Sequence, residues 1–301
     1  MAHDHNHLAH GPRYAGRAFA VGIALNLAFV VVEAVYGVLA HSMALLADAG
    51  HNLSDALALT LAWGASALAR RGPSERFTYG LRSSSILVAI LNAMLLLVVT
   101  GGIAWEAINR LAAPSPVAGE TVIWVALVGI LVNGASAMLF VRHRRRDVNM
   151  RGAFLHLAAD AAVSLGVVVA GIGMVFTWWL WLDPITGLLI AAAIVWATWG
   201  LLRDSVALAL NAVPEHIDPR VVRTYLSRLA GVAEVHDLHI WAMSTTETAL
   251  TVHLVMPGGH PGDALTAEAC KELRERFDVH HATIQIEIGA QPCELAPDHV
   301  V

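Results

Sequence analysis

Six apolar runs dominate the first 204 residues of the chain. Most contain the roughly 20 residues that a helix needs to cross the hydrocarbon core of a bilayer. The runs cover residues 17–40, 43–69, 84–108, 117–141, 153–176 and 185–202. Of the 301 residues, 56% are hydrophobic and only 14% are charged, a balance that soluble domains rarely have. The sequence therefore predicts an α-helical membrane protein with six transmembrane helices.

Arginines predict how these helices are oriented. They cluster before the first run, after the second and after the fourth, whereas the opposite loops carry little beyond Arg110. Because loops rich in basic residues stay in the cytoplasm, both termini are predicted to be cytoplasmic. The first run is too long for a cleavable signal peptide and follows a polar tail, so it is predicted to remain as a helix.

The composition changes near residue 205 to that of a soluble domain. Asp218 is placed to cap a helix that begins at Pro219 and ends before Gly231. A second helix is predicted at 263–277, and strands are predicted at 235–243, 248–256 and 282–288. The order αββαβ predicts a small α+β domain with two helices on one face of a three-stranded sheet.

Four segments follow from these boundaries. We expect a histidine-bearing tail at 1–16, a membrane domain at 17–204, a cytoplasmic domain at 205–289 and a carboxy-terminal tail at 290–301. The histidines of the first tail either capture metal or simply make the tail polar, and both readings stay open. They are His3, His5, His7 and His10.

Two short strings repeat the pattern His-x-x-x-Asp inside the apolar runs. They are His51 to Asp55 in the second run and His156 to Asp160 in the fifth, and they hold the only histidines of the predicted spans. A spacing of four places both side chains on one face of a helix. Ionisable groups at membrane depth are costly and usually line an ion pathway or pair with one another. The strings therefore predict a four-ligand site between the second and fifth helices.

This set of ligands suits a divalent transition metal. Two imidazoles and two carboxylates favour zinc in tetrahedral geometry, whereas magnesium and calcium need more oxygens. The two carboxylates also neutralise a divalent ion, and protons compete with the metal for the same atoms. Such competition is sufficient for exchange of metal against protons. Asp48, one turn before His51, is placed to orient a ligand or to relay protons.

Other readings of these residues stay open. The two His/Asp pairs could serve only as hydrogen bonds between helices. An intramembrane metal-dependent hydrolase also uses His and Asp ligands, but it needs an open coordination position and a separate general base. A membrane-anchored zinc sensor would place the function in the soluble domain, although six spans exceed what an anchor needs. Glu33, in the first run, either lines a cavity or bonds to a neighbouring helix.

The string from Leu46 to Asp55, together with His156 and Asp160, resembles the cation diffusion facilitator family. The string Thr78-Tyr-Gly-Leu-Arg82 and the αββαβ domain are also similar to this family, so the resemblance covers nearly the whole chain. It implies a homodimeric zinc exporter driven by protons, with a metallochaperone-like cytoplasmic domain, in a bacterial inner membrane. The loop after the second helix has no histidine at the positions where one branch of the family binds additional metal.

The same resemblance implies a second zinc site in the cytoplasmic domain, where zinc acts as a regulatory ligand. By similarity the best ligand candidates are His236, His253 and Glu287, with Cys293 and Asp263 behind them. Zinc and protons are thus the expected substrates, and a second copy of the chain and membrane lipid are the expected partners. With a net charge of -5 and a single lysine, the chain shows no basic footprint for nucleic acid.

Overall fold

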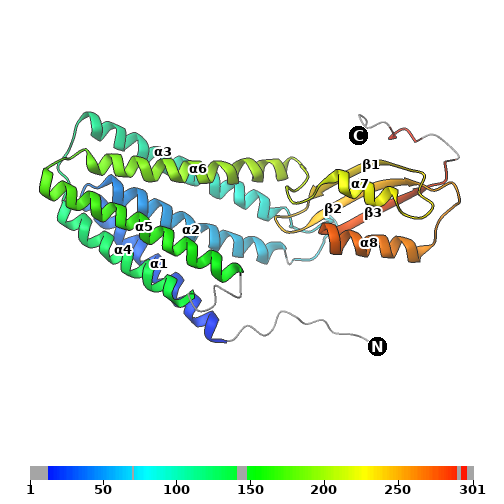
Figure 1. Cartoon of the computed structure of the whole chain (residues 1–301), viewed down its shortest axis with the longest axis horizontal. Helices are drawn as coiled ribbons and strands as arrows, with labels where there is room; N and C mark the ends of the chain where they lie inside the picture. Colours follow the sequence, from blue (N-terminus) through cyan, green and yellow to red (C-terminus); the bar gives the residue numbers. More distant parts are fainter. Residues whose placement is uncertain (1–12, 70, 141–147, 290–292, 297–301) are drawn as a thin grey trace. The chain divides into compact units, whose positions relative to one another are not determined.

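The computed structural model describes residues 13–69, 71–140, 148–289 and 293–296 (Figure 1). The histidines of the first tail and the four arginines of the loop at 141–147 lie outside these residues. The described residues form two compact units. One combines residues up to 60 with 92–200, and the other combines 61–91 with the residues from 201 onward.

Six long helices make up the apolar part of the chain (Figure 1). They are α1 (Arg13–Leu39), α2 (Met43–Ala69), α3 (Ser84–Ala112), α4 (Gly119–Phe140), α5 (Val148–Thr177) and α6 (Leu182–Ala209). Within the described residues, four of them, α3 to α6, are both long and apolar enough to cross a membrane. For α1 and α2 the predicted spans remain predictions. The helix α6 is longer than its apolar run and continues past residue 205 to Ala209.

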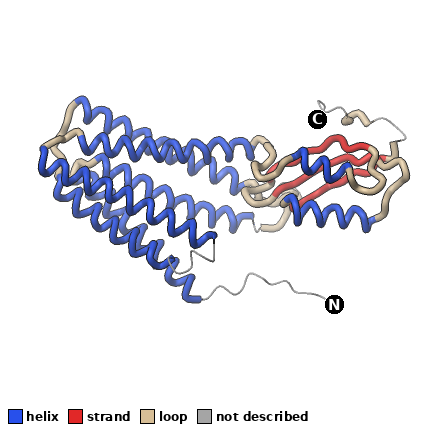
Figure 2. The backbone as a smooth tube through the Cα atoms, in the orientation of Figure 1, coloured by secondary structure: helices blue, strands red, loops and turns tan. Residues whose placement is uncertain are grey.

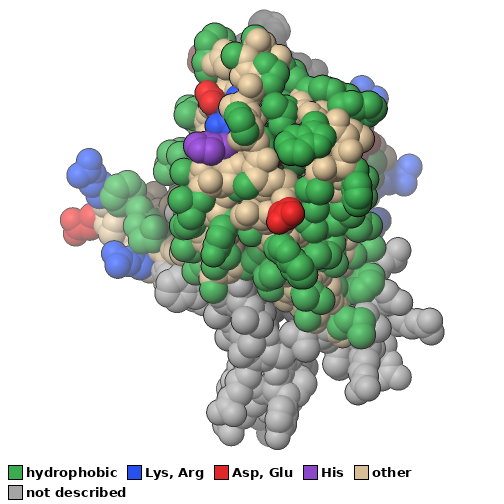
Figure 3. Space-filling view, turned by 90° about the vertical axis from the view of Figure 1, so that its left-hand side faces the viewer, with side chains coloured by type: hydrophobic (Ala, Val, Ile, Leu, Met, Phe, Trp, Pro, Cys, Tyr) green, Lys and Arg blue, Asp and Glu red, His purple; other side chains and the backbone are tan. Residues whose placement is uncertain are grey.

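The outer surface of the helices is mainly hydrophobic. Figure 3 faces the ends of the helices, seen at the left of Figure 1, where hydrophobic side chains also predominate and charged ones are isolated. Large side chains such as Val98, Trp124 and Leu131 are mostly exposed. In a membrane this surface faces lipid, which is the solvent that a helix of this composition requires.

Small residues allow α4 to pack closely between α1 and α5. A Cβ atom added to Gly129 of α4 would lie 2.8 Å from the Phe29 ring of α1 and 3.0 Å from the Ser164 hydroxyl of α5. A Cβ atom on Gly171 of α5 would lie 2.7 Å from Ile123 of α4. Because lipid gives helices no hydrophobic reason to associate, such close backbone approach is an important source of packing energy in membranes.

The start of α2 is held by α6. Asp183, fully buried at the first turn of α6, accepts hydrogen bonds from the Ser42 hydroxyl at 2.5 Å and from the Met43 amide at 2.6 Å. The first amides of a helix have no partner within the helix, so an acceptor from another segment stabilises the helix end. This contact fixes where α2, the helix of His51 and Asp55, begins.

The carboxy-terminal domain has the predicted element order αββαβ. Its elements are α7 (Pro219–Ser227), β1 (Glu234–Ala242), β2 (Thr248–Val255), α8 (Asp263–Phe277) and β3 (Val279–Glu287). The sheet order is β1-β2-β3, with β1 antiparallel and β3 parallel to β2. The predicted cap is confirmed, because Asp218 Oδ1 accepts from the Arg220 amide at 2.8 Å.

Both helices of this domain pack on one face of the sheet (Figure 2). Leu250, Val252 and Leu254 of β2 point into a core with Leu226 of α7 and Leu273 of α8. Residues alternate between the two faces of a strand, so His253 points to the opposite face. The third strand begins at Val279, three residues before the predicted start, because His280 and His281 continue its alternation.

Candidate metal centre

The two His-x-x-x-Asp strings lie together between α2 and α5. Four distances join a histidine Nε2 to a carboxylate oxygen. They are 3.7 Å for His51–Asp55, 3.4 Å for His51–Asp160, 3.2 Å for His156–Asp55 and 3.6 Å for His156–Asp160. In a tetrahedral zinc site with bonds of about 2.1 Å, neighbouring ligand atoms are about 3.4 Å apart. These four histidine–carboxylate distances are therefore close to those between the ligands of one such ion.

The group has a buried side and an open side. The Asp160 side chain is 5% exposed, whereas that of His156 is 48% exposed. His51, Asp55 and Asp160 each offer a ligand atom within 4.8 Å of the others, and His156 lies at the edge of this trio. The His51 and His156 ring centroids are 6.3 Å apart.

Two more carboxyl groups lie behind the four residues. Glu33 of α1 and Asp48 of α2 are fully buried and contact each other. Asn52 Nδ2 donates to Glu33 Oε2 at 3.1 Å, and Ser164 Oγ donates to Asp48 Oδ2 at 3.0 Å. Among the described residues, the other oxygen of each carboxyl group has no hydrogen-bond donor. One proton held between the two groups would give both oxygens a partner.

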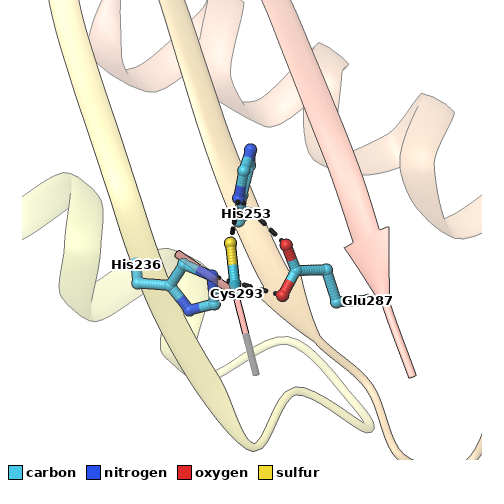
Figure 4. Close-up of side chains that lie close together, drawn as sticks. All are labelled: His236, His253, Glu287 and Cys293. Carbon is cyan, nitrogen blue, oxygen red and sulfur yellow. Dashed lines mark hydrogen bonds and ion pairs between the residues drawn. The ribbon is translucent and has the colours of Figure 1, made fainter. Parts of the chain in front are cut away.

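A second group of metal-binding side chains lies on the open face of the carboxy-terminal sheet (Figure 4). His236, His253, Glu287 and Cys293 each offer a ligand atom within 4.8 Å of the others. Glu287 lies 3.3 Å from His236 Nε2 and 3.0 Å from His253 Nδ1. The Cys293 sulfur lies 3.6 Å from His253 Nδ1. Figure 4 shows these side chains pointing toward one another.

A β-bulge in β1 shapes this group. His236 pairs with His253, and His239 pairs with Thr251, so two residues of β1 stand opposite one of β2. Asp237, within the bulge, has a φ of 49°, a left-handed conformation that Asp tolerates better than most residues. Its carboxylate lies 3.4 Å from His253 Nε2 and 2.8 Å from His239 Nε2. Bulges commonly redirect side chains in this way next to functional sites.

Two pKa shifts describe the electrostatics of the group. Partial burial raises the pKa of Glu287, but hydrogen bonds with Cys293 and Gln285 and the nearby imidazoles outweigh it, and the pKa is lowered. For Cys293, a backbone hydrogen bond at Leu295 lowers the pKa. Desolvation and the Glu287 carboxylate together outweigh this effect, so the pKa of Cys293 is raised. Glu287 is therefore suited to stay ionised beside two imidazoles.

Sequence reasoning placed most of these side chains but missed Asp237. All seven residues predicted as metal ligands lie in one of the two groups, whereas Asp263 begins α8, is exposed and lies in neither group. Cys293, only a secondary candidate from the sequence, is a full member of the second group. The sequence could not indicate that Asp237 lies beside this group. The bulge that points its side chain toward His253 depends on how β1 pairs with β2.

Comparisons with known proteins agree with the resemblance. The family model of the cation efflux transmembrane domain matches residues 19–208, and that of the cation efflux protein cytoplasmic domain matches residues 214–288. The chain is 36% identical over 303 residues to the zinc transporter ZitB of Escherichia coli, covering 99% of this chain and 95% of the relative. It is 35% identical over 295 residues to the metal cation efflux system protein CzcD of Cupriavidus metallidurans, covering 98% and 92%. It is 29% identical over 299 residues to the cadmium, cobalt and zinc/H(+)-K(+) antiporter of Bacillus subtilis, covering 96% and 93%.

Proposed function

The chain belongs to the cation diffusion facilitator family of cation efflux proteins, and from this premise we propose that it exports zinc from the cytoplasm in exchange for protons. The transported ion binds His51, Asp55, His156 and Asp160 between α2 and α5. The observation that carries this assignment is the set of four histidine–carboxylate distances, all between 3.2 and 3.7 Å. The names of relatives support the substrates, since one is a zinc transporter and another a zinc/H(+)-K(+) antiporter.

Exchange follows from competition for the same atoms. Zinc needs neutral imidazoles and ionised carboxylates, so protons arriving at these four residues weaken zinc binding. Two carboxylates neutralise the bound ion, which lowers the cost of holding it at membrane depth. Zinc binds when the site faces the cytoplasm and leaves when the site faces outward and takes up protons. A site near the midplane with helices that rock around it is the usual solution for such transporters.

The buried pair of Glu33 and Asp48 holds α1, α2 and α5 together around the site. Asn52, which bonds Glu33, directly follows His51, and Ser164, which bonds Asp48, lies one turn after Asp160. A shared proton gives both carboxyl groups a complete set of partners. The pair thus acts as a positioning element for α2 and α5, the two helices that carry the ligands.

The remaining assignments extend this function to the whole chain. Residues 17–204 form the six-helix membrane domain, and residues 205–289 form a cytoplasmic domain in which His236, His253 and Glu287 bind zinc as a regulatory ligand. The protein is a homodimer in a bacterial inner membrane, surrounded by lipid, with both termini cytoplasmic. Metal binding can regulate transport only if the metal binds one arrangement of the domain more tightly than another.

Zinc binding to the full-length protein in detergent tests the membrane site. Asp160→Asn should bind one zinc ion fewer per chain than the wild type, because it removes a ligand charge at the buried side of the group. The wild-type affinity at this site should fall as the pH is lowered, because protons take the places of zinc. Isothermal titration over a series of pH values measures both quantities.

Asp204→Asn is the matched control. Asp204 is an acid of α6 whose carboxylate pairs with the neighbouring Arg203, so its amide variant should bind as many ions as the wild type. If Asp160→Asn kept the wild-type number of zinc ions and the same pH dependence, the assignment of the ligands would be wrong. Family membership favours transport over the hydrolase and sensor readings, and a zinc-dependent peptidase activity would reopen the hydrolase reading.

A further inference from the structure

The turn between α1 and α2 is closed by its own backbone. It lies at the same end of the helices as the loops after α3 and α5 (Figure 1). His41 is left-handed with a φ of 53°, its amide donates to the Val38 carbonyl at 3.2 Å, and the Ser42 amide donates to the Gly37 carbonyl at 2.9 Å. This is the Schellman ending of a helix. The Ser42 hydroxyl then caps α2 by accepting from the Leu45 amide at 3.2 Å, so the turn has little freedom to bend.

Two further helices bind the backbone of this turn. Ala118, just before α4, donates its amide to the Ala40 carbonyl at 3.1 Å. Asp183 of α6 accepts from the Ser42 hydroxyl and from the Met43 amide. Ala40, Ser42 and Asp183 are almost fully buried, so a partial opening of this contact would leave polar groups without partners.

Arg110 adds a third contact, from the last turn of α3. Its guanidinium donates to the His41 carbonyl, and its Nε donates to Glu106, one turn earlier, at 3.0 Å. The Arg110 side chain is only 17% exposed. Its positive charge also attracts the buried carboxylate of Asp183. The bond to Glu106 fixes the direction in which the guanidinium points, so α3 and α6 hold the start of α2 together.

We propose that this joint, residues 40–43 with Arg110 and Asp183, stays closed during transport and is the pivot about which the ligand-bearing helices turn. Arg110 and Asp183 are its positioning residues. The inference rests on the proposed function, because it concerns the movement of the helices that carry zinc. Opening the joint in every cycle would leave Asp183 buried without donors, and the loss of the partners of a buried charge is among the most costly changes in a protein.

The geometry of α2 suits a pivot at its start. His51 and Asp55 lie 8 and 12 residues after Met43, which is about 12 and 18 Å at the rise of an α-helix. A tilt of about 10° would move His51 by about 2 Å, similar to helix shifts in known conformational changes. Hydrogen bonds at Glu33 and Asp48 connect α2 with α1 and α5, so the three helices tilt together. A small tilt thus moves the whole ligand group while the joint stays intact.

A disulfide across the joint tests whether it must open. Ser42 Oγ and Asp183 Oδ1 lie 2.5 Å apart, so cysteines at both positions are placed to form a disulfide. Ser42→Cys and Asp183→Cys are combined in a chain whose two native cysteines are replaced by serine. In proteoliposomes, the oxidised protein should transport zinc as fast as the same protein after reduction. Zinc flux that stopped on oxidation and returned on reduction would overturn the proposal.

Arg110 provides a second test, in a protein that keeps Asp183. Arg110→Ala should lower the maximal zinc flux about two- to tenfold, the range that corresponds to one ordinary hydrogen bond. The zinc concentration for half-maximal flux should not change, because no ligand is touched. Arg110→Lys should recover part of the flux, since its ammonium can still donate to the His41 carbonyl. Arg203→Ala, at an exposed arginine of α6 outside the joint, is the control and should keep the wild-type flux.

The outcomes separate this inference from the proposed function. Wild-type protein that moved no zinc against protons would contradict the proposed function and the pivot with it. Normal wild-type flux together with a proton leak in Arg110→Ala without zinc would show that the joint is a gate, which overturns the pivot alone. Unchanged maximal flux in Arg110→Ala would show that Arg110 does not position the joint.

Discussion

Glu33 and Asp48 show how single residues support the site without touching the ion. Both are fully buried, and each has one carboxyl oxygen without a donor among the described residues. In a low-dielectric interior an unpaired polar atom costs about 1–3 kcal/mol, so one proton shared between the two groups would stabilise the fold. The pair is also joined to Asn52 and Ser164, which are neighbours of the ligands in α2 and α5.

Substitution of Glu33 tests this account. Glu33→Gln should retain most of the stability, because the amide can donate to Asp48 and still accept from Asn52. Glu33→Ala should lose about 1–3 kcal/mol, because it leaves Asp48 Oδ1 and Asn52 Nδ2 without partners. Unfolding of the two variants in detergent measures the difference. Equal stability of the two variants would show that the contact between the carboxyl groups contributes nothing.

The sequence could predict which ligands of the membrane site lie side by side on one helix. A spacing of four places His and Asp on one face of a helix, so their proximity within each string could be predicted. The contact of Asp183 with Ser42 joins residues 141 positions apart, and nothing local signals it. The approach of Cys293 to His253 is also a contact over a long separation, so the sequence suggested the cysteine only through its resemblance to a family.

At the scale of elements, a close contact between α6 and the start of α2 positions the helix that carries two of the ligands. A Cβ atom added to Gly187 of α6 would lie 2.9 Å from the backbone carbonyl carbon of Met43. Gly187 lies one turn after Asp183, which binds the same end of α2. Only glycine lets the two backbones come this close.

Gly187→Ala should therefore destabilise the protein by about 1–3 kcal/mol and reduce zinc transport, because the backbone of α2 must shift. Gly200→Ala is the control in the same helix. A Cβ atom at Gly200 would meet nothing within 4 Å, so this substitution should leave stability unchanged or raise it by up to about 1 kcal/mol. Thermal unfolding in detergent compares the two. Equal effects would mean that the close approach does not matter.

The order of elements in the carboxy-terminal domain was predictable, and its fine register was not. Caps, turns and alternation gave the order αββαβ, and the second helix was predicted with its observed bounds. The bulge in β1 adds one residue that pairs with nothing, and its position depends on contacts with β2. The sequence could therefore suggest His236 as a ligand through the family, but it could not place Asp237 beside it.

For the whole molecule, the main prediction concerns orientation. Cys270 and Cys293 both belong to the carboxy-terminal domain and are the only cysteines of the chain. If the termini are cytoplasmic, a membrane-impermeant maleimide should label Cys270 in inside-out vesicles but not in intact cells. In a variant without these cysteines, Ala113→Cys in the loop after α3 should show the opposite pattern. Labelling of Cys270 in intact cells would contradict the proposed orientation.

Zinc flux in proteoliposomes under an imposed pH gradient tests the central claim most directly, with the lumenal pH recorded at the same time. The account predicts zinc movement coupled to opposite proton movement in the wild type, and loss of both in folded Asp55→Ala. Undiminished zinc flux in Asp55→Ala would contradict proton-coupled export through the site between α2 and α5. Wild-type zinc flux that does not depend on the pH gradient would contradict it as well.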